Sequence, residues 1–197
     1  MKSPLFTPEN AAMLLIDHQV GTMGWVGSAS LDAIKMNTLA LARAADAIDM
    51  PLILTSSMED QAQGPLFEEL QQAVPEAYAN RILRGGVVDS MKDEGFAKAV
   101  KDSGRKNLII AGITTDVCVV YPAITAVSQG YNVQVIVDGS GSPTQIADET
   151  ALRRMENNGV TLTTTNQLIA ELAQDWSTDN GQKLIQVLFE EILSKQH

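Results

Sequence analysis

Three side chains of different chemical character follow separate apolar runs of the sequence. Asp17 comes directly after the run 11–16, Arg84 follows a short apolar stretch, and Cys118 follows the run 107–112. If these runs are parallel strands, their carboxyl ends meet at one edge of the sheet, where open α/β sheets bind ligands. A thiol beside a carboxylate and a guanidinium suits nucleophilic catalysis, because the carboxylate can act as a base.

Cys118 is the only cysteine of the chain. It lies two or three residues into a predicted helix if Thr115 or Asp116 is the N-cap. Backbone N–H groups and the helix dipole would then favour the thiolate, and the same N–H groups could hold the oxyanion of a tetrahedral intermediate. Free cysteine is also among the most buried residue types, so position alone leaves open that Cys118 only fills space.

The other candidates have plainer interpretations too. Asp17 could cap the following turn, although a buried charge is costly unless it is paired or needed as a base. Arg84 could be a solvated surface charge. Asp138, after the run 132–137, is interpreted as a cap, and His18 as an ordinary packed or exposed side chain rather than a ligand.

Further residues at this edge are candidates for weaker contacts with a substrate: Gln19, Trp25, Ser57 and Thr115. The loops expected around the pocket are 18–28, 56–66, 84–92 and 139–145. Trp25 could offer an aromatic wall or could equally pack in a subunit interface. None of these loops identifies the substrate.

Strand and helix patterns that would position these residues alternate along the chain. Nearly continuous apolar runs, typical of strands buried on both faces, occupy 11–16, 51–55, 107–112, 132–137 and more weakly 160–165, with a short one at 81–83. Helical patterns lie between them, at 31–48 behind a predicted N-cap at Ser30, 94–102, 117–129 and 144–158, with Gly130 and Gly159 as C-caps. The alternation predicts one α/β domain over 1–197, a three-layer Rossmann-like fold with an open, mostly parallel sheet of about six strands and helices on both faces.

A last helix at about 180–195 is not followed by a strand. Its apolar stripe consists of Leu184, Ile185, Leu188, Ile192 and Leu193. The stripe could pack on its own sheet or form a subunit interface, and both interpretations stay open.

Composition limits the classes of partner. The chain has 197 residues and a formal charge of −10, without a cluster of Lys and Arg, which argues against nucleic acid. A single cysteine excludes an intrachain disulfide, and the N-terminus has neither a signal-peptide nor a transit-peptide pattern, so we expect a cytoplasmic protein. No apolar run approaches the ~20 residues that cross a bilayer.

Two motifs, LLIDHQ at 14–19 and AGITTDVCV at 111–119, resemble the isochorismatase-like cysteine hydrolases, the superfamily that includes nicotinamidases. The likeness runs through nearly the whole chain. RILRGG at 81–86, GPL at 64–66 and the C-terminal helix are most similar to the YcaC-type hydrolases within that superfamily.

The resemblance implies a catalytic triad. Asp17 would take the proton of Cys118, and Arg84 would hold the place that a lysine usually occupies. It also implies a cis peptide at Ile113–Thr114 and an oxyanion hole formed by the amides of Thr114 and Cys118. YcaC-type proteins form octamers of two stacked rings, so a homo-oligomer that uses the C-terminal helix is expected.

Two departures from the wider superfamily narrow the activity. Nicotinamidases bind a metal through histidines after the second strand, where this chain reads TSSMEDQAQG, so we expect no metal or other cofactor and consider nicotinamide a poor candidate substrate. Arg84 can fix charge and geometry but cannot shuttle a proton as lysine might.

The first hypothesis is a metal-independent hydrolase that cleaves a C–N bond of a small amide, carbamoyl or imide compound through a Cys118 acyl-enzyme. Isochorismatases proper cleave an ether without the cysteine, which argues against that reaction here. The alternative is a ligand-binding or thiol-reactive protein without turnover. A nucleotide-binding protein is set aside, because no G-x-G-x-x-G follows the first strand.

Overall fold

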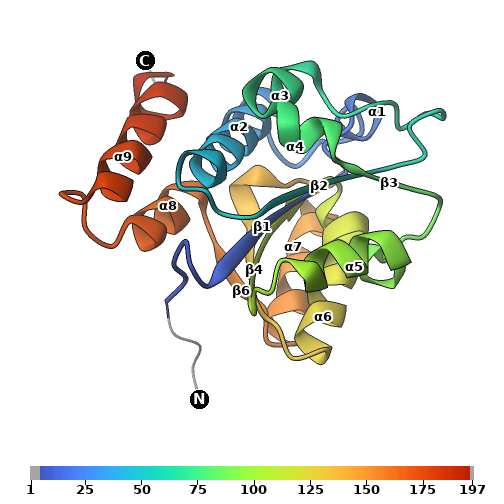
Figure 1. The fold of residues 1–197 in the computed structure, drawn as a ribbon. Coiled ribbons are helices and arrows are strands. Elements are labelled where there is room, and N and C mark those ends of the chain that lie inside the picture. The colour runs from blue at the N-terminus through green and yellow to red at the C-terminus, as the bar shows by residue number, and fades with distance from the viewer. Residues whose placement is uncertain (1–4, 196–197) are drawn as a thin grey trace.

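The computed structural model describes residues 5–195, which form one open sheet of six strands between two layers of helices (Figure 1). The strand order is β3-β2-β1-β4-β5-β6, and every neighbouring pair is parallel. The strands are β1 (Ala11–Ile16), β2 (Leu52–Ser57), β3 (Ile82–Arg84), β4 (Asn107–Gly112), β5 (Asn132–Ile136) and β6 (Thr161–Thr163). The predicted α/β class and the open parallel sheet are confirmed.

Connections run outward in opposite directions from β1 and β4, so the strand order reverses between these two strands. Such a reversal opens a crevice at the carboxyl ends of the strands, where ligands of open α/β sheets bind. The register pairs Ile16 with Gly112, so β1 and β4 end at the same level. The residues that follow the two strands therefore start side by side.

Successive side chains of the central strands enter opposite cores. Met13 and Leu15 pack in one core, whereas Leu14 and Ile16 pack in the other. Because both faces are covered, these strands contain apolar residues in continuous runs rather than in alternation.

Helices cover both faces of the sheet (Figure 1). One side carries α2 (Leu31–Ala47), α3 (Glu68–Ala73), α4 (Pro75–Ala79), α8 (Thr165–Ala173) and α9 (Asp179–Glu191). The other side carries α5 (Glu94–Asp102), α6 (Val120–Ser128) and α7 (Gln145–Glu156). Short turns of helix include α1 (Val20–Met23), 3₁₀ segments at Ser90–Lys92, Val137–Gly139 and Leu193–Lys195, and a π-helical turn at Thr115–Val119.

Helix ends follow local sequence rules. Asp93 accepts a hydrogen bond from the Phe96 N–H at 2.9 Å, and Thr144 caps α7 in the same way. Gly130 and Gly159 each have a φ of 86°, as expected of glycines that follow a helix. Ser30 precedes α2 as predicted, but its side chain makes no capping hydrogen bond.

The C-terminal helix, α9, packs against its own fold with part of its apolar stripe. Leu184, Leu188 and Ile192 are buried in the core that includes α2. Phe189 and Leu193 remain 57% and 38% exposed. The helix itself ends at Glu191, and a 3₁₀ turn continues the chain to Lys195.

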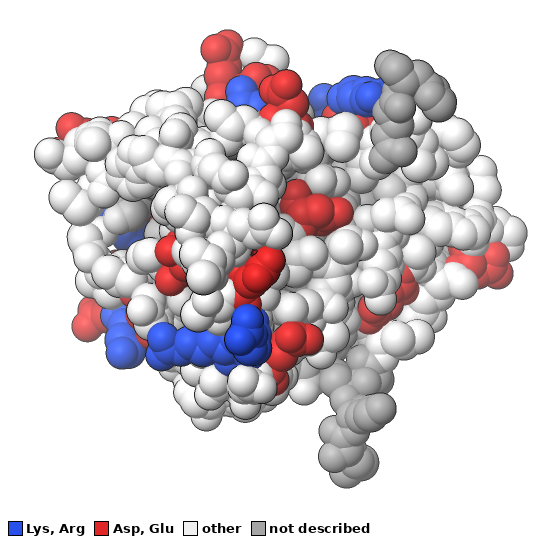
Figure 2. All heavy atoms as spheres, turned by 180° about the vertical axis from the view of Figure 1, so that it is seen from behind, with Lys and Arg blue, Asp and Glu red and all other residues white. Residues whose placement is uncertain are grey.

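Charges of both signs mix on the face opposite to the view of Figure 1. Lys and Arg form a short band near the lower edge of this face, with Asp and Glu beside it (Figure 2). Among residues 5–195, no helix combines the length and the hydropathy needed to span a bilayer.

Candidate active site

Asp17, Arg84 and Cys118 come together at the carboxyl edge of the sheet. Asp17 directly follows β1, Arg84 ends β3, and Cys118 lies in the π-helical turn after β4. Cys118 and Asp17 line the same cavity, and Arg84 Nη2 donates to Asp17 Oδ1. The fold thus brings together the three residues that the sequence singled out.

Asp17 is held in an unusual backbone conformation. Its φ is 56°, in the left-handed region that Asp tolerates better than most residues. The Asp17 N–H donates to Thr55 O at 2.9 Å, and Thr22 Oγ1 donates to Asp17 O at 2.8 Å. Burial raises the pKa of the Asp17 carboxyl above its usual value, while Arg84 opposes this shift. A raised pKa suits a carboxylate that must accept and return a proton.

Arg84 is a buried cation rather than the surface charge that was one interpretation of the sequence; its side chain is 1% exposed. Its Nε donates to Thr55 Oγ1 and its Nη1 to Val87 O, each at 2.9 Å, while Nη2 donates to Asp17. The guanidinium is therefore fixed by three different partners and holds the carboxylate beside the thiol.

The surroundings of Cys118 favour the thiol over the thiolate expected of a helix N-terminus. Burial and the negative charge of Asp17 raise the pKa of Cys118 above its ordinary range, and the Thr114 amide and Arg84 oppose the shift only in part. The expectation of a lowered pKa is wrong, because the residue is enclosed and faces a carboxylate.

The two amides expected in the oxyanion hole differ in their hydrogen bonds. The Ile113–Thr114 bond is cis. The Cys118 N–H donates to Thr114 O at 2.8 Å within the π-helical turn, so it is already paired. The backbone of Thr114 acts on the Cys118 thiol in the direction that lowers its pKa.

A cavity of about 180 Å³ opens over Cys118. Gln19, Trp25 and Ser57 line it, as expected for substrate contacts. Thr115 is not among the residues that line it: the residue is buried, and its N–H donates to Gly141 O at 2.8 Å. The remaining lining residues include Thr22, Met58, Gln63, Gly86, Val87, Val88 and Val117.

Gln19 organises the loops around the cavity. Its Oε1 accepts the Ser57 N–H at 2.9 Å, and its Nε2 donates to Ser57 O at 2.9 Å and also to Gly64 O. The amide is thus fully paired, which makes Gln19 a positioning residue for the walls.

Asp138 and His18 have structural roles. Asp138 Oδ1 accepts hydrogen bonds from the N–H and the Oγ1 of Thr165, both at 2.8 Å, so it caps α8. His18 is buried, and its Nε2 donates to Gly139 O at 2.9 Å. Burial lowers the pKa of His18 to about 4.

Sequence reasoning missed the residues that orient Arg84. Thr55 supplies its hydroxyl and Val87 its backbone carbonyl. A carbonyl carries no side-chain signal, and Thr55 lies inside an apolar run, where it is indistinguishable from a core residue.

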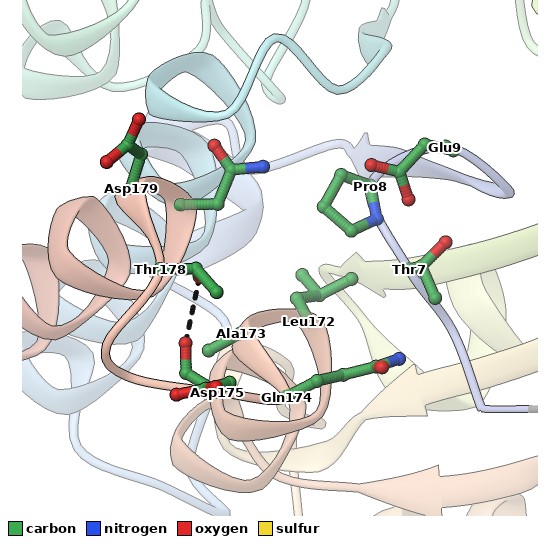
Figure 3. A pocket seen from close by; sticks show the side chains of 10 residues that line it. Thr7, Pro8, Glu9, Leu172, Ala173, Gln174, Asp175, Thr178 and Asp179 are labelled. Carbon is green, nitrogen blue, oxygen red and sulfur yellow. Dashed lines mark hydrogen bonds between the residues drawn. The ribbon is translucent and has the colours of Figure 1, made fainter.

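A larger cavity lies away from Cys118. A cavity of about 500 Å³ lies between the segment 7–9 and the α8–α9 connection (Figure 3). There Thr178 Oγ1 donates to Asp175 O at 2.9 Å, and the lining includes Glu9 and Asp179 but no thiol. Within the described range, no cluster of three His, Cys, Asp or Glu residues could hold a metal ion.

A half-buried cysteine beside a buried carboxylate–guanidinium pair, at the switch of an open parallel sheet, is the kind of site that a cysteine hydrolase needs. The isochorismatase domain model matches residues 11–167, so the chain belongs to the isochorismatase family. It is 40% identical over 170 residues to the probable hydrolase YcaC of Escherichia coli (strain K12), covering 86% of this chain and 81% of that protein.

Two solved structures are similar to the chain in both fold and sequence. The YcaC gene product from Escherichia coli, described as an octameric hydrolase of unknown specificity, superposes with a TM-score of 0.91 at 38% identity, covering 98% of this chain and 93% of that one. YcaC from Pseudomonas aeruginosa, solved with hexane-2,5-diol and covalent acrylamide, gives a TM-score of 0.91 at 37% identity, covering 98% and 94%.

Proposed function

We propose that this protein is a metal-independent cysteine hydrolase that cleaves a C–N bond of a small amide, carbamoyl or imide compound. The observation that carries the proposal is that the Cys118 thiol lines the same cavity as the buried Asp17 carboxylate, which Arg84 holds in place. Membership of a hydrolase family supports the reaction class.

Acylation uses Asp17 as base and then as acid. As the Cys118 sulfur attacks the carbonyl carbon, its proton passes to Asp17, and the oxygen of the tetrahedral intermediate gains charge beside the Thr114 N–H. The C–N bond then breaks, the amine leaves with the proton from Asp17, and the acyl group remains on sulfur as a thioester.

In deacylation Asp17 again acts first as base and then as acid, with water as the nucleophile. Asp17 takes a proton from water as its oxygen attacks the thioester carbon. The C–S bond breaks, the acid is released, and the proton returns to Cys118. Arg84 cannot deprotonate, so it acts by keeping the Asp17 carboxylate oriented through the cycle.

Cys118→Ala tests the proposal. A panel of primary amides, carbamoyl compounds and imides is assayed for ammonia or amine release, and acid-quenched reactions are examined by intact mass. We expect the substitution to lower turnover at least ~1000-fold, as removal of a nucleophile does, and to abolish an acyl adduct seen in the wild type. Full turnover by Cys118→Ala would contradict the proposal.

A second candidate is a thiol-reactive protein without turnover. The covalent acrylamide in the Pseudomonas aeruginosa structure favours it, since acrylamide is an electrophile. Stoichiometric adducts without catalytic regeneration of Cys118 would support this candidate over the first.

We propose further that the chain assembles into a homo-oligomer of the octameric kind described for the Escherichia coli protein and uses α9 in the interface. The exposed Phe189 and Leu193 support this role. A cytoplasmic location is part of the same proposal, because a reducing compartment keeps a catalytic thiol reduced.

A further inference from the structure

We propose that the site selects small, uncharged substrates with an apolar acyl group and rejects those that carry a carboxylate or phosphate. The inference rests on the proposed function and adds the substrate class. The observation that supports this inference is that most polar groups of the cavity are already hydrogen-bonded within the protein.

The cation of the cavity offers little to an anionic substrate. Arg84 is the only Lys or Arg among the residues that line the cavity. Three of its five N–H groups donate to Asp17, Thr55 and Val87, and its side chain is only 1% exposed. A substrate carboxylate would therefore face the Asp17 carboxylate without a counter-ion, in a protein whose net charge is −10. Burial of such an unpaired charge is strongly unfavourable.

Most uncharged polar groups of the cavity are also hydrogen-bonded within the protein. Both ends of the Gln19 amide bond to backbone, and Ser57 Oγ donates to Gly85 O at 2.8 Å. Thr22 Oγ1 donates to Asp17 O. The Gln63 amide reaches only Met58 Sδ, at 3.8 Å, which leaves it able to pair with a neutral polar group.

Apolar side chains form the exposed rim of the cavity. Five of them are between 37% and 51% exposed: Trp25, Met58, Val87, Val88 and Val117. Such surface gains free energy when an apolar acyl group covers it. The volume of about 180 Å³ is below the ~300–1,000 Å³ of pockets that take drug-sized ligands, so the acyl group is small.

Alkylation of Cys118 tests the charge preference without requiring turnover. The neutral reagent iodoacetamide and the anionic reagent iodoacetate are compared by intact mass at one pH, with glutathione as the reference thiol. We expect the protein to favour iodoacetamide at least ~30-fold more than glutathione does. A ratio equal to or below that of glutathione would overturn the inference.

Val88 offers a matched pair of variants. Val88→Lys places a cation at the rim, and Val88→Gln adds a polar side chain of similar length without charge. We expect Val88→Lys to lower the selectivity for iodoacetamide at least ~5-fold relative to Val88→Gln. Equal selectivity in the two variants would contradict an electrostatic origin of the preference.

A pair of amides separates failure of the inference from failure of the proposed function. Succinamate carries a carboxylate where 4-methylpentanamide carries an isopropyl group of similar shape. We expect kcat/KM for 4-methylpentanamide to be at least ~100-fold higher. Preferred turnover of succinamate would overturn the inference and leave the hydrolase standing. No turnover of any amide, with alkylation still selective, would contradict the hydrolase and support the charge preference.

Discussion

At the residue scale, the site depends on how three neighbouring groups, those of Asp17, Arg84 and Cys118, act on one another electrostatically. Burial and, after it, the Asp17 carboxylate raise the pKa of Cys118, whereas the Arg84 guanidinium acts to lower the pKa of both Cys118 and Asp17. A raised pKa favours the thiol over the thiolate, so in the proposed mechanism the thiolate and the protonated Asp17 form during attack. This arrangement differs from one in which a helix terminus holds a permanent thiolate.

Alkylation of Cys118 against pH checks this account. Because the Cys118 pKa is raised, we expect the rate with iodoacetamide to keep rising to pH 10 without a plateau. Asp17→Asn removes the charge that raises the pKa, so the rate at pH 8 should increase at least ~5-fold. Arg84→Gln removes a cation that lowers the pKa, so that rate should decrease.

Circular dichroism of each variant controls for misfolding, since either substitution leaves a buried charge unpaired. A wild-type plateau near pH 7, together with slower alkylation of Asp17→Asn, would contradict this account.

His18 makes folding stability depend on pH. Its folded pKa, about 4, lies below the ordinary histidine value of 6.5, because burial disfavours the charged ring. The stability that it contributes is fully present above pH 6.5 and is lost as pH falls through 4, by about 3 kcal/mol.

Urea unfolding at pH 7.5 and at pH 4 measures the loss, and His18→Gln is the comparison. We expect the fall in unfolding free energy to be smaller by about 3 kcal/mol in the variant, because the titrations of the carboxylates are common to both proteins. Equal falls would show that His18 is not buried in its neutral form.

At the element scale, the pairing of β1 with β4 sets the distance between Asp17 and Cys118, the proposed base and nucleophile. Gly112 ends β4 and pairs with Ile16, the last residue of β1. A Cβ at Gly112 would lie 2.5 Å from Ile16 O and 3.0 Å from Val119 Cγ2. The close approach of the two backbones thus requires glycine at this position.

Gly112→Ala is expected to lower the unfolding free energy by about 2 kcal/mol, because overpacking moves backbone as well as side chains. It should also reduce kcat at least ~10-fold, since it displaces both strands that lead into the site. Urea unfolding and amide turnover measure the two effects.

Gly85→Ala is the control, because nothing lies within 4 Å of the Cβ it would add. We expect its unfolding free energy to stay within about 0.5 kcal/mol of wild type. Equal destabilisation by the two substitutions would refute the packing argument.

Strong elements were predictable from sequence and weak ones were not. The runs 11–16, 94–102 and 107–112 match β1, α5 and β4, because long apolar or amphipathic patterns determine these elements locally. α3, α4 and α8 were missed, and β3 was expected one residue early, since short elements depend on tertiary contacts.

The positions of the main site residues were predictable from the sequence, but their local environment was not. The edge of the sheet, Asp17, Arg84 and Cys118 followed from spacing and resemblance. The π-helical turn and the raised pKa of Cys118 did not, because both depend on how the chain packs around the thiol.

At the scale of the whole molecule, α9 packs against the core with one side and exposes apolar surface on another. Its Leu184 and Leu188 are buried against α2 and its neighbours, whereas Phe189 is 57% exposed. A helix that packs inward with one stripe and exposes an aromatic residue on another suits a subunit interface.

Phe189→Glu is therefore expected to reduce the molar mass in light scattering from that of a large oligomer to a smaller species. Lys183→Gln changes the net charge by the same amount on the same helix and should leave the mass unchanged. A wild-type mass of a single chain at micromolar concentration would contradict the assembly.

The pairing of β1 with β4 also bears on how the site comes into existence. Asp17 and Cys118 are roughly a hundred residues apart in the chain, and Arg84 lies between them. Such non-local pairings form late, because the intervening loop must be closed before its contacts contribute. A nascent chain that has emerged only as far as β3 contains Asp17 and Arg84 but not Cys118, so the proposed site is complete only after β4 has paired with β1.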